Sequence, residues 1–436
     1  LVFLLLPHFN IIANKNIHFS ISPTDALFAI AIVLLTALIA GAYPAFYLSS
    51  LKPATVLKSR KANFELLARR ALVIAQFSIS IIFIVSFIVI TNQMEYTQTI
   101  NLGYSKDNIV LFKRQGHFKE EEYNVFMTEL KRIPGVVNAS SLYGSLLDDV
   151  GMSTGFSWDG QISNGKGMLF PSPMISHDLI ETLGIEVIAG RSFRAGSNDS
   201  TNVVINETAA KLMTFKDPIG QPITYGDQIF CVIGVVKDFH YGSLHNSIEP
   251  LIFRYSPNRN DIVVKIQAGQ EQNLLPELKK VYESFHSDYA FEYSFMDSLY
   301  KALYNTETRT AELLKYFTAI AILISCLGLL GLASFVAQQR LKEICIRKVY
   351  GSSMINVILL LSNDFTRTIV IAIVVSGPLS YFLANNWLNE FVYRIPFSWM
   401  YVVEASLLAL LVAWLTIGGL IYRAATINPS RGLKVE

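Results

Sequence analysis

Residues 71–92 read ALVIAQFSISIIFIVSFIVITN and contain no charged side chain. A second uncharged stretch, residues 316–337, reads YFTAIAILISCLGLLGLASFVA. At a rise of about 1.5 Å per residue, each stretch can cross a bilayer core of roughly 30 Å as a helix. The mostly polar residues 94–312 separate the two stretches. The chain is therefore predicted to be a membrane protein with one large domain on one side of the bilayer.

Three further apolar runs, near residues 25–48, 368–384 and 400–422, complete this pattern. Composition agrees with it, since 52% of the residues are hydrophobic and only 16% are charged. Soluble domains carry about 25% charged residues. The net charge of +2 is too small to suggest a nucleic-acid partner. We therefore expect a multi-pass protein with an α-helical transmembrane bundle, in contact with membrane lipid.

Positive charge gathers in three segments that border the apolar runs, residues 49–70, 339–354 and 423–436. The basic residues concerned are Lys52, Lys58, Arg60, Lys61, Arg69, Arg70, Arg340, Lys342, Arg347, Lys348, Arg423, Arg431 and Lys434. Basic residues are enriched in the cytoplasmic loops of membrane proteins, so these segments are predicted to face the cytoplasm. The number of spans then places residues 94–312 on the opposite side of the membrane.

An internal repeat links the first and last apolar runs. Residues 42–58 read AYPAFYLSSLKPATVLK, and residues 418–434 read GGLIYRAATINPSRGLK. Pro53 matches Pro429, and a Leu-Lys pair ends both stretches in the same register. We interpret this as a duplicated four-span module, of which residues 1–58 are the end of the first copy. The alternative is coincidence, because basic residues often follow a span.

The outside domain is predicted to be mixed α/β. Two β-α-β patterns lie at its ends. Their segments are Asn108–Lys113, Lys119–Arg132 and Val136–Tyr143, then Asp261–Gln267, Gln272–Phe285 and Phe291–Met296. In the first helix Tyr123, Phe126, Met127 and Leu130 share one face. Two such units around an insert, about 150–258, indicate a split ferredoxin-like subdomain with a β-rich insert.

Local signals add detail to this domain. Ile229–Val236 is fully apolar and is expected to be a strand buried on both faces. Asn206 is expected to cap a helix over Glu207–Met213. Thr91–Ile100 and Ser298–Lys315 are both helical in pattern, so we expect two stalk helices that lead out of and back into the membrane. Alternatively, these two helices only separate the outside domain from the membrane.

Two patterns resemble enzymatic motifs but lack residues that those motifs require. Residues 160–167 read GQISNGKG, but a phosphate-binding loop needs Ser or Thr after the Lys and a strand before the loop. His240 and His245 lie near Asp238, but no third ligand or Ser-His-Asp pattern accompanies them. We expect a turn after a buried strand there, and no catalytic residue, cofactor or metal.

The loop QQRLKEICIRKVYGSSMINVI (338–358) and the C-terminal NPSRGLK (428–434) carry a resemblance to a known family. They are similar to the signature loop and the C-terminus of FtsX-like ABC transporter permeases of the MacB/LolE type. Four further motifs resemble the MacB-like periplasmic core domain. They are LIETLGIEVIAGRSF (179–193), VVINETAAKL (203–212), DPIGQPI (217–223) and VIGVVKDFHYGSLHNSIEPLIF (232–253). The chain looks like the latter part of a duplicated eight-span permease.

The resemblance implies a type VII ABC system, in the inner membrane, that works by mechanotransmission. An ABC ATP-binding subunit would dock at the cytoplasmic loop, and the stalks would carry its motion to the periplasmic domain. The positions that match the family's ATPase contact are Glu343, Arg347, Lys348 and Gly351. A second permease half or chain, and a periplasmic or outer-membrane partner, are further implied. The substrate would be a lipoprotein, a peptide or a toxic compound.

These expectations divide the chain into four parts. They are 1–58, the end of a first permease module; 59–93, a cytoplasmic segment and span; 94–312, the periplasmic core domain; and 313–436, a three-span permease domain with a cytoplasmic loop at 339–354. Two other functions remain open at this point. One is a regulatory platform that activates a periplasmic cell-wall hydrolase or a sensor kinase. The other is a membrane-anchored enzyme, which would need titratable groups converging near His240.

Overall fold

The computed structural model describes two compact units of the chain. The described residues are 6–7, 9–10, 16–17, 22–49, 62–116, 119–147, 150–161, 168–257, 259–339, 346, 350 and 354–426. Unit 1 comprises the described parts of Leu1–Asn92, Glu307–Trp387 and Pro396–Glu436. Unit 2 comprises the described parts of Gln93–Thr306 and Leu388–Ile395.

Unit 1 is helical. Its helices lie in α2 (Pro23–Ser49), α4 (Ala62–Thr99), α10 (Asn305–Gln339), α12 (Met354–Leu388) and α13 (Met400–Thr426). Four stretches of these described helices are long and apolar enough to cross a membrane. They are Leu67–Thr99, Asn305–Gln339, Ser362–Leu388 and Met400–Gly419. The helix α2 adds a shorter apolar stretch, Pro23–Leu38. Four of the five predicted transmembrane helices are thus present with sufficient length and apolar character, and the described part of the fifth is shorter.

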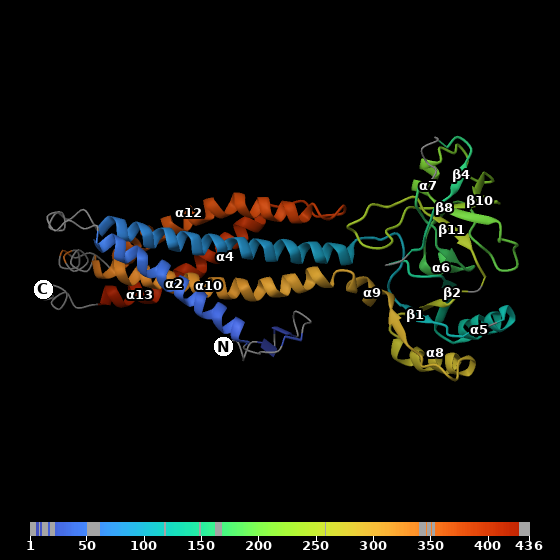
Figure 1. The fold of residues 1–436 in the computed structure, drawn as a ribbon, viewed down its shortest axis with the longest axis horizontal. Helices are drawn as coiled ribbons and strands as arrows, with labels where there is room; N and C mark the ends of the chain where they lie inside the picture. The colour runs from blue at the N-terminus through green and yellow to red at the C-terminus, as the bar shows by residue number, and fades with distance from the viewer. Residues whose placement is uncertain are drawn as a thin grey trace. The chain divides into compact units, whose positions relative to one another are not determined.

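The helix α4 is the central one of the unit. Half of its apolar stretch is buried, against 28% in α10, so α4 has neighbours on more sides. Serine side chains form hydrogen bonds between α4 and its neighbouring helices. The Ser80 and Ser325 Oγ atoms lie 3.0 Å apart between α4 and α10, and Ser78 donates to the Ala372 carbonyl of α12 at 3.3 Å. Figure 1 shows these helices running alongside one another.

Unit 2 contains the predicted ferredoxin-like subdomain. Its elements are β1 (Ile109–Lys113), α5 (Glu120–Arg132), β2 (Val136–Leu142), β12 (Asp261–Ile266), α8 (Glu271–Phe285) and β13 (Tyr293–Phe295). The strand order is β13-β1-β12-β2, with every pair antiparallel. The four residues predicted on one face of α5 are all buried, in a shared core with Leu278 of α8. Both helices therefore cover the same face of the sheet (Figure 1).

The insert extends the same sheet. Its elements are β3 (Met152–Ser153), β4 (Phe156–Trp158), β5 (Phe170–Pro171), β6 (Met174–Ile175), α6 (Leu179–Leu183), β7 (Val187–Gly190), β8 (Asn202–Asn206), α7 (Glu207–Leu212), β9 (Pro222–Tyr225), β10 (Gln228–Val236) and β11 (Ile252–Tyr255). One pair, Leu142 with Ile175, joins it to β2. Asn206 caps α7 as predicted, because its side chain accepts the Ala209 N–H at 2.9 Å.

Two sequence expectations need correction. The strand β10 is not buried on both faces throughout, because Ile229 is 66% exposed. Successive strand residues point to opposite faces, and at this end only the Phe230 face meets the core. The second stalk is also not one helix. The helix α9 (Met296–Ala302) ends before α10 begins, and a tight turn places the Tyr304 N–H on the Lys301 carbonyl at 3.1 Å.

Candidate functional site

The residues predicted to contact an ATPase all lie outside the described part of the chain, so their role stays a prediction. They are Glu343, Arg347, Lys348 and Gly351. Two described neighbours show local helical geometry, since the Tyr350 N–H donates to the Ile346 carbonyl at 3.1 Å. Both side chains are exposed, at 49% for Ile346 and 87% for Tyr350. The GQISNGKG loop lies largely outside the described residues as well.

The segment KDFHYGSLH (237–245) follows β10 as a loop. The Asp238 carboxylate accepts two hydrogen bonds from Thr208, one from N–H at 2.9 Å and one from Oγ1 at 2.8 Å. This contact fixes the loop to the start of α7. Among the described residues, no group of three or more His, Cys, Asp or Glu side chains is placed to hold a metal ion. The hydrogen bonds to Thr208 show that Asp238 positions the loop against α7.

Four points mark where the chain passes into or out of unit 2. They lie before Gln93 within α4, after Thr306 within α10, before Leu388 at the end of α12, and after Ile395. Side chains of unit 2, most of them buried, gather at these points, and we call them the anchor cluster. Its members are Gln93, Thr97, His240, Leu244, His245, Tyr300, Tyr304, Phe391 and Tyr393.

Gln93 ties the end of α4 to the segment 388–395. Its side chain is fully buried. The Nε2 atom donates to the Tyr393 carbonyl at 3.0 Å, and Oε1 accepts the Ile395 N–H at 2.9 Å. A buried amide must satisfy both its donor and its acceptor, and here each has a backbone partner some three hundred residues away in the chain. One side chain therefore joins two distant segments.

Two tyrosines tie α9 and the start of α10 to the same region. The Tyr300 hydroxyl donates to the Thr97 carbonyl of α4 at 2.9 Å. The Tyr304 hydroxyl accepts the Leu244 N–H at 2.9 Å. Burial raises the pKa of Tyr300, so its hydroxyl stays protonated and remains a donor. The break between α9 and α10 is thus the place where Tyr304 meets the loop 237–245.

Ring contacts complete the cluster. His245 packs on Phe391 with ring centroids 3.9 Å apart, and His240 packs edge-on against Tyr393 at 4.2 Å. The Tyr393 N–H also donates to the Leu244 carbonyl at 3.3 Å. Burial lowers the pKa of His240, although the nearby Asp238 carboxylate acts in the opposite direction. His240 is therefore neutral at pH 7 and acts as a packing ring.

The hydrogen bonds of the cluster hold its segments together. Breaking one without replacement costs about 1–3 kcal/mol for each buried group left unpaired. The loop 237–245 continues β10, which pairs with β7, β8 and β9. The cluster is therefore continuous with the middle of the sheet.

Two family models match different parts of the chain. The model of the MacB-like periplasmic core domain matches residues 71–278, and that of the FtsX-like permease C-terminal domain matches residues 316–429. The macrolide export ATP-binding/permease protein MacB of Aggregatibacter actinomycetemcomitans is 24% identical over 42% of this chain and 31% of its own length. A probable export ATP-binding/permease protein of Pseudomonas fluorescens is 27% identical over 41% and 29%. The chain thus spans about a third of the length of these relatives.

Among solved structures, the periplasmic region of MacB from Actinobacillus actinomycetemcomitans gives a TM-score of 0.34 at 17% identity. That match covers 48% of this chain and 98% of that one. The extracellular domain of the noncanonic ABC-type transporter YknZ from Gram-positive bacteria gives 0.31 at 16% identity, over 43% and 98%.

The two family matches, in this order along one chain, define a class of membrane protein. The chain belongs to the FtsX/MacB-like permeases of ABC transporters. It is a multi-pass inner-membrane protein, and unit 2 carries its periplasmic domain.

The sequence indicated a loop at residues 237–245 but did not indicate its contacts with distant segments. Its two histidines suggested a metal or acid–base role, which was set aside in favour of a simple turn. The structure instead shows a loop contacted by Tyr304, Phe391 and Tyr393. A signal was present in the polar Gln93, placed directly after an uncharged span, but its partners lie too far along the chain for any local pattern to identify.

Proposed function

We propose that this chain is the permease subunit of an ABC transporter that works by mechanotransmission. A partner subunit would bind and hydrolyse ATP in the cytoplasm, and the membrane helices would carry the resulting motion to the periplasmic domain. The anchor cluster is the observation that supports this best. Its hydrogen bonds join Gln93 of α4 to the segment 388–395, Tyr300 of α9 to Thr97 of α4, and Tyr304, directly before α10, to Leu244 of the loop 237–245.

The polar groups of the spans support an energy source outside the bilayer. Proton- and ion-coupled carriers place carboxylates or histidines within their spans. Residues 71–92 and 316–337 contain no charged side chain. Their buried serines, Ser80 and Ser325, hydrogen-bond to each other. Such a contact links the two helices, and the uncharged character of these two spans fits a subunit driven by a separate ATPase.

The substrate in this proposal is a molecule of the cell envelope, such as a lipoprotein, a peptide or a toxic compound. Both curated relatives are named for export, one of them for macrolides. Two permease halves, from one chain or two, would pair around the ATP-binding subunits. A periplasmic or outer-membrane component would take up the substrate from unit 2.

Co-purification tests the proposal at the cytoplasmic loop. The full-length protein would be isolated in mild detergent, as wild type and as the double variant Glu343→Lys, Gly351→Pro. Asp288→Lys is the matched control, because it reverses an exposed carboxylate in unit 2. We expect an ABC ATP-binding subunit to accompany wild type and the control but not the double variant. Absence of an ATPase from folded wild type, or equal recovery with the double variant, would contradict the proposal.

A further inference from the structure

Unit 2 contains a pocket of about 580 Å³ that the anchor cluster does not use. It lies against the ferredoxin-like sheet, on the face opposite α5 and α8. The strand register shows this, because Ser294, Leu111 and Val263 are cross-strand neighbours and line the pocket. The flanking residues Val110 and Val264 belong to the core beneath the two helices. Side chains alternate between the faces of a sheet, so the two sets point in opposite directions.

The floor and walls of the pocket are apolar. They are formed by Leu111, Leu142, Leu146, Leu147, Leu183, Val263, Met296 and Leu299. These residues come from the sheet, from the loop after β2, from the end of α6 and from α9. A volume of this size lies within the range of ligand-binding pockets, about 300–1,000 Å³. The pocket can therefore take up a large apolar side chain together with part of its backbone.

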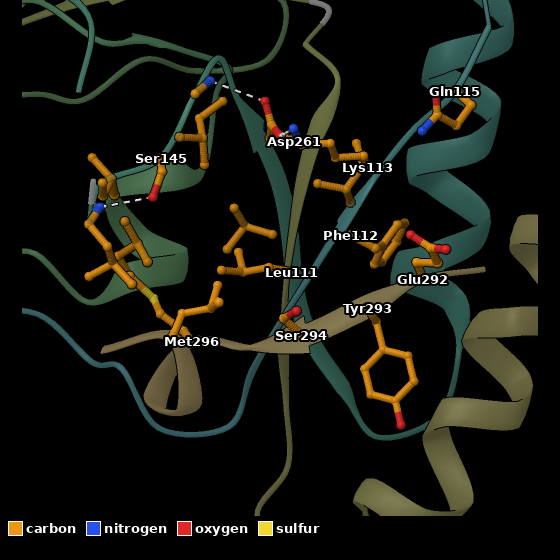
Figure 2. Close-up of a pocket in the computed structure, with 18 of the residues that line it drawn as sticks. Leu111, Phe112, Lys113, Gln115, Ser145, Asp261, Glu292, Tyr293, Ser294 and Met296 are labelled. Atoms are coloured by element: carbon orange, nitrogen blue, oxygen red, sulfur yellow. Dashed lines mark hydrogen bonds and ion pairs between the residues drawn. The ribbon is translucent and has the colours of Figure 1, made fainter. Parts of the chain in front are cut away.

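Charged side chains lie along one side of the pocket (Figure 2). Lys113 and Asp261 are cross-strand neighbours with a nitrogen–oxygen distance of 4.0 Å, and Glu292 lies on the adjoining segment. Asp261 is held in place because its Oδ2 accepts the Gly144 N–H at 3.1 Å. The Lys113 side chain is 75% exposed. Asp261 and Glu292 together outweigh the single charge of Lys113, so this side carries a net negative charge that attracts a cation.

The strand β13 forms the open side of the pocket. It is the last strand of the sheet, and among the strands that the structure describes it pairs only with β1. Its residues Tyr293 and Ser294, and Glu292 before them, are exposed. A strand at a sheet edge presents unpaired N–H and C=O groups, which can pair with an extended peptide.

We propose that this pocket binds an extended polypeptide segment, which adds as a strand to the free edge of β13. An apolar side chain of the segment lies over Ser294 toward Leu111, and a basic side chain lies beside Glu292. The backbone edge supplies affinity, while the pocket and its charged side supply specificity. A lipid acyl chain fits these features less well, since it uses neither a strand edge nor carboxylates. This binding site is independent of ATP coupling.

Fluorescence anisotropy with a labelled peptide tests the proposal on the full chain in phosphatidylcholine nanodiscs. The probe is the peptide TLTLTK, which alternates apolar and polar residues and ends in a lysine. TLTLTE is its charge-reversed counterpart, and lauric acid is the acyl-chain competitor. Ser294→Trp fills the pocket from an exposed position, with Ser284→Trp on α8 as its control. Glu292→Lys reverses the rim charge, with Glu277→Lys on α8 as its control.

We expect saturable binding of TLTLTK that Ser294→Trp weakens about tenfold or more and Ser284→Trp leaves unchanged. Glu292→Lys should shift the preference toward TLTLTE by about tenfold, while Glu277→Lys should not. No saturable binding, or binding that Ser294→Trp does not weaken, would overturn the proposal. So would binding of lauric acid without peptide binding. Because no ATPase is needed, this test can fail while the proposed function holds.

Discussion

The membrane helices and the anchor cluster use hydrogen bonds in different ways. In unit 1 the helices are linked by isolated hydroxyl contacts, such as Ser80 with Ser325 and Ser78 with the Ala372 carbonyl. In unit 2 a single side chain, Gln93, holds two backbone groups of another segment, and Tyr304 holds a third. Among the described residues, unit 1 also has an ion pair between Arg70 of α4 and Asp364 of α12 at 3.9 Å, whereas in unit 2 the Gln93 side chain alone joins two backbone groups.

The proposed mechanism would use this difference between the two regions. Interhelical hydrogen bonds in membranes contribute about 0.6 kcal/mol on average, so helices joined by one or two of them can shift at low cost. Breaking a buried hydrogen bond in the anchor cluster costs about 1–3 kcal/mol for each group left unpaired. In the proposed mechanism, motion would arise among the helices of unit 1 and would be passed on at the anchor cluster.

The largest effect is expected from Gln93→Leu. This change leaves the Tyr393 carbonyl and the Ile395 N–H without their partners, at a combined cost of about 2–6 kcal/mol. Thermal unfolding of the full chain would show it as a melting temperature several degrees lower. Gln98→Leu, an exposed glutamine on the same helix, is the control and should melt like wild type. Equal melting temperatures of the two variants would show that Gln93 does not stabilise the cluster.

A smaller effect is expected from Tyr304→Phe. The variant keeps the ring but removes the acceptor of the buried Leu244 N–H, which costs about 1–3 kcal/mol. The same melting experiment measures it. Tyr293→Phe removes a hydroxyl from an exposed tyrosine and should have no effect. If both substitutions were neutral, the link between α10 and the loop 237–245 would be weaker than we infer.

The helices of unit 1 should tolerate more change. A Cβ added at Gly328 would meet the Gln76 Oε1 atom of α4, the far end of a flexible side chain that can move away. We therefore expect Gly328→Leu to cost only about 1 kcal/mol through overpacking. Gly331→Leu, where nothing lies near the added Cβ, is the control. A loss for Gly328→Leu larger than that for Gln93→Leu would reverse the comparison between the two regions.

The smallest effect concerns pH. Burial lowers the pKa of His240 below its ordinary value of 6.5, so the folded state binds the proton more weakly than the unfolded state does. The stability that neutral His240 contributes is therefore present above pH 6.5 and is lost as the pH falls through its lowered pKa. His177 and His286 also have lowered pKa values and behave alike. Melting of wild type and His240→Gln between pH 7.5 and 5.5 should show a shallower pH dependence in the variant; equal slopes would contradict the assignment.

Local patterns predicted the elements well and the anchor cluster not at all. The apolar face of α5 followed from helical spacing, and the cap at Asn206 followed from residue type, because both depend on near neighbours. The break before α10 was missed. The break lies next to the hydrogen bond from the Leu244 N–H to the Tyr304 hydroxyl, which joins residues sixty positions apart. The spacing of apolar residues within Ser298–Lys315 cannot reveal such a distant contact.

The pocket was missed for a related reason. Its walls combine the loop after β2, the end of α6 and α9, which only the tertiary fold brings together. Its charged side depends on the register that sets Lys113 opposite Asp261. The predicted ATPase contact at Glu343, Arg347, Lys348 and Gly351 lies outside the described residues and stays a prediction.

The most direct test of coupling through the anchor cluster is hydrogen–deuterium exchange over residues 237–245. It would be measured on the full chain bound to its ATP-binding partner, with and without a non-hydrolysable ATP analogue. We predict that the nucleotide changes exchange in this loop in wild type, and that Gln93→Leu abolishes the change while nucleotide still binds the partner. An unchanged loop in wild type, or an equal response in the variant, would contradict coupling by this route.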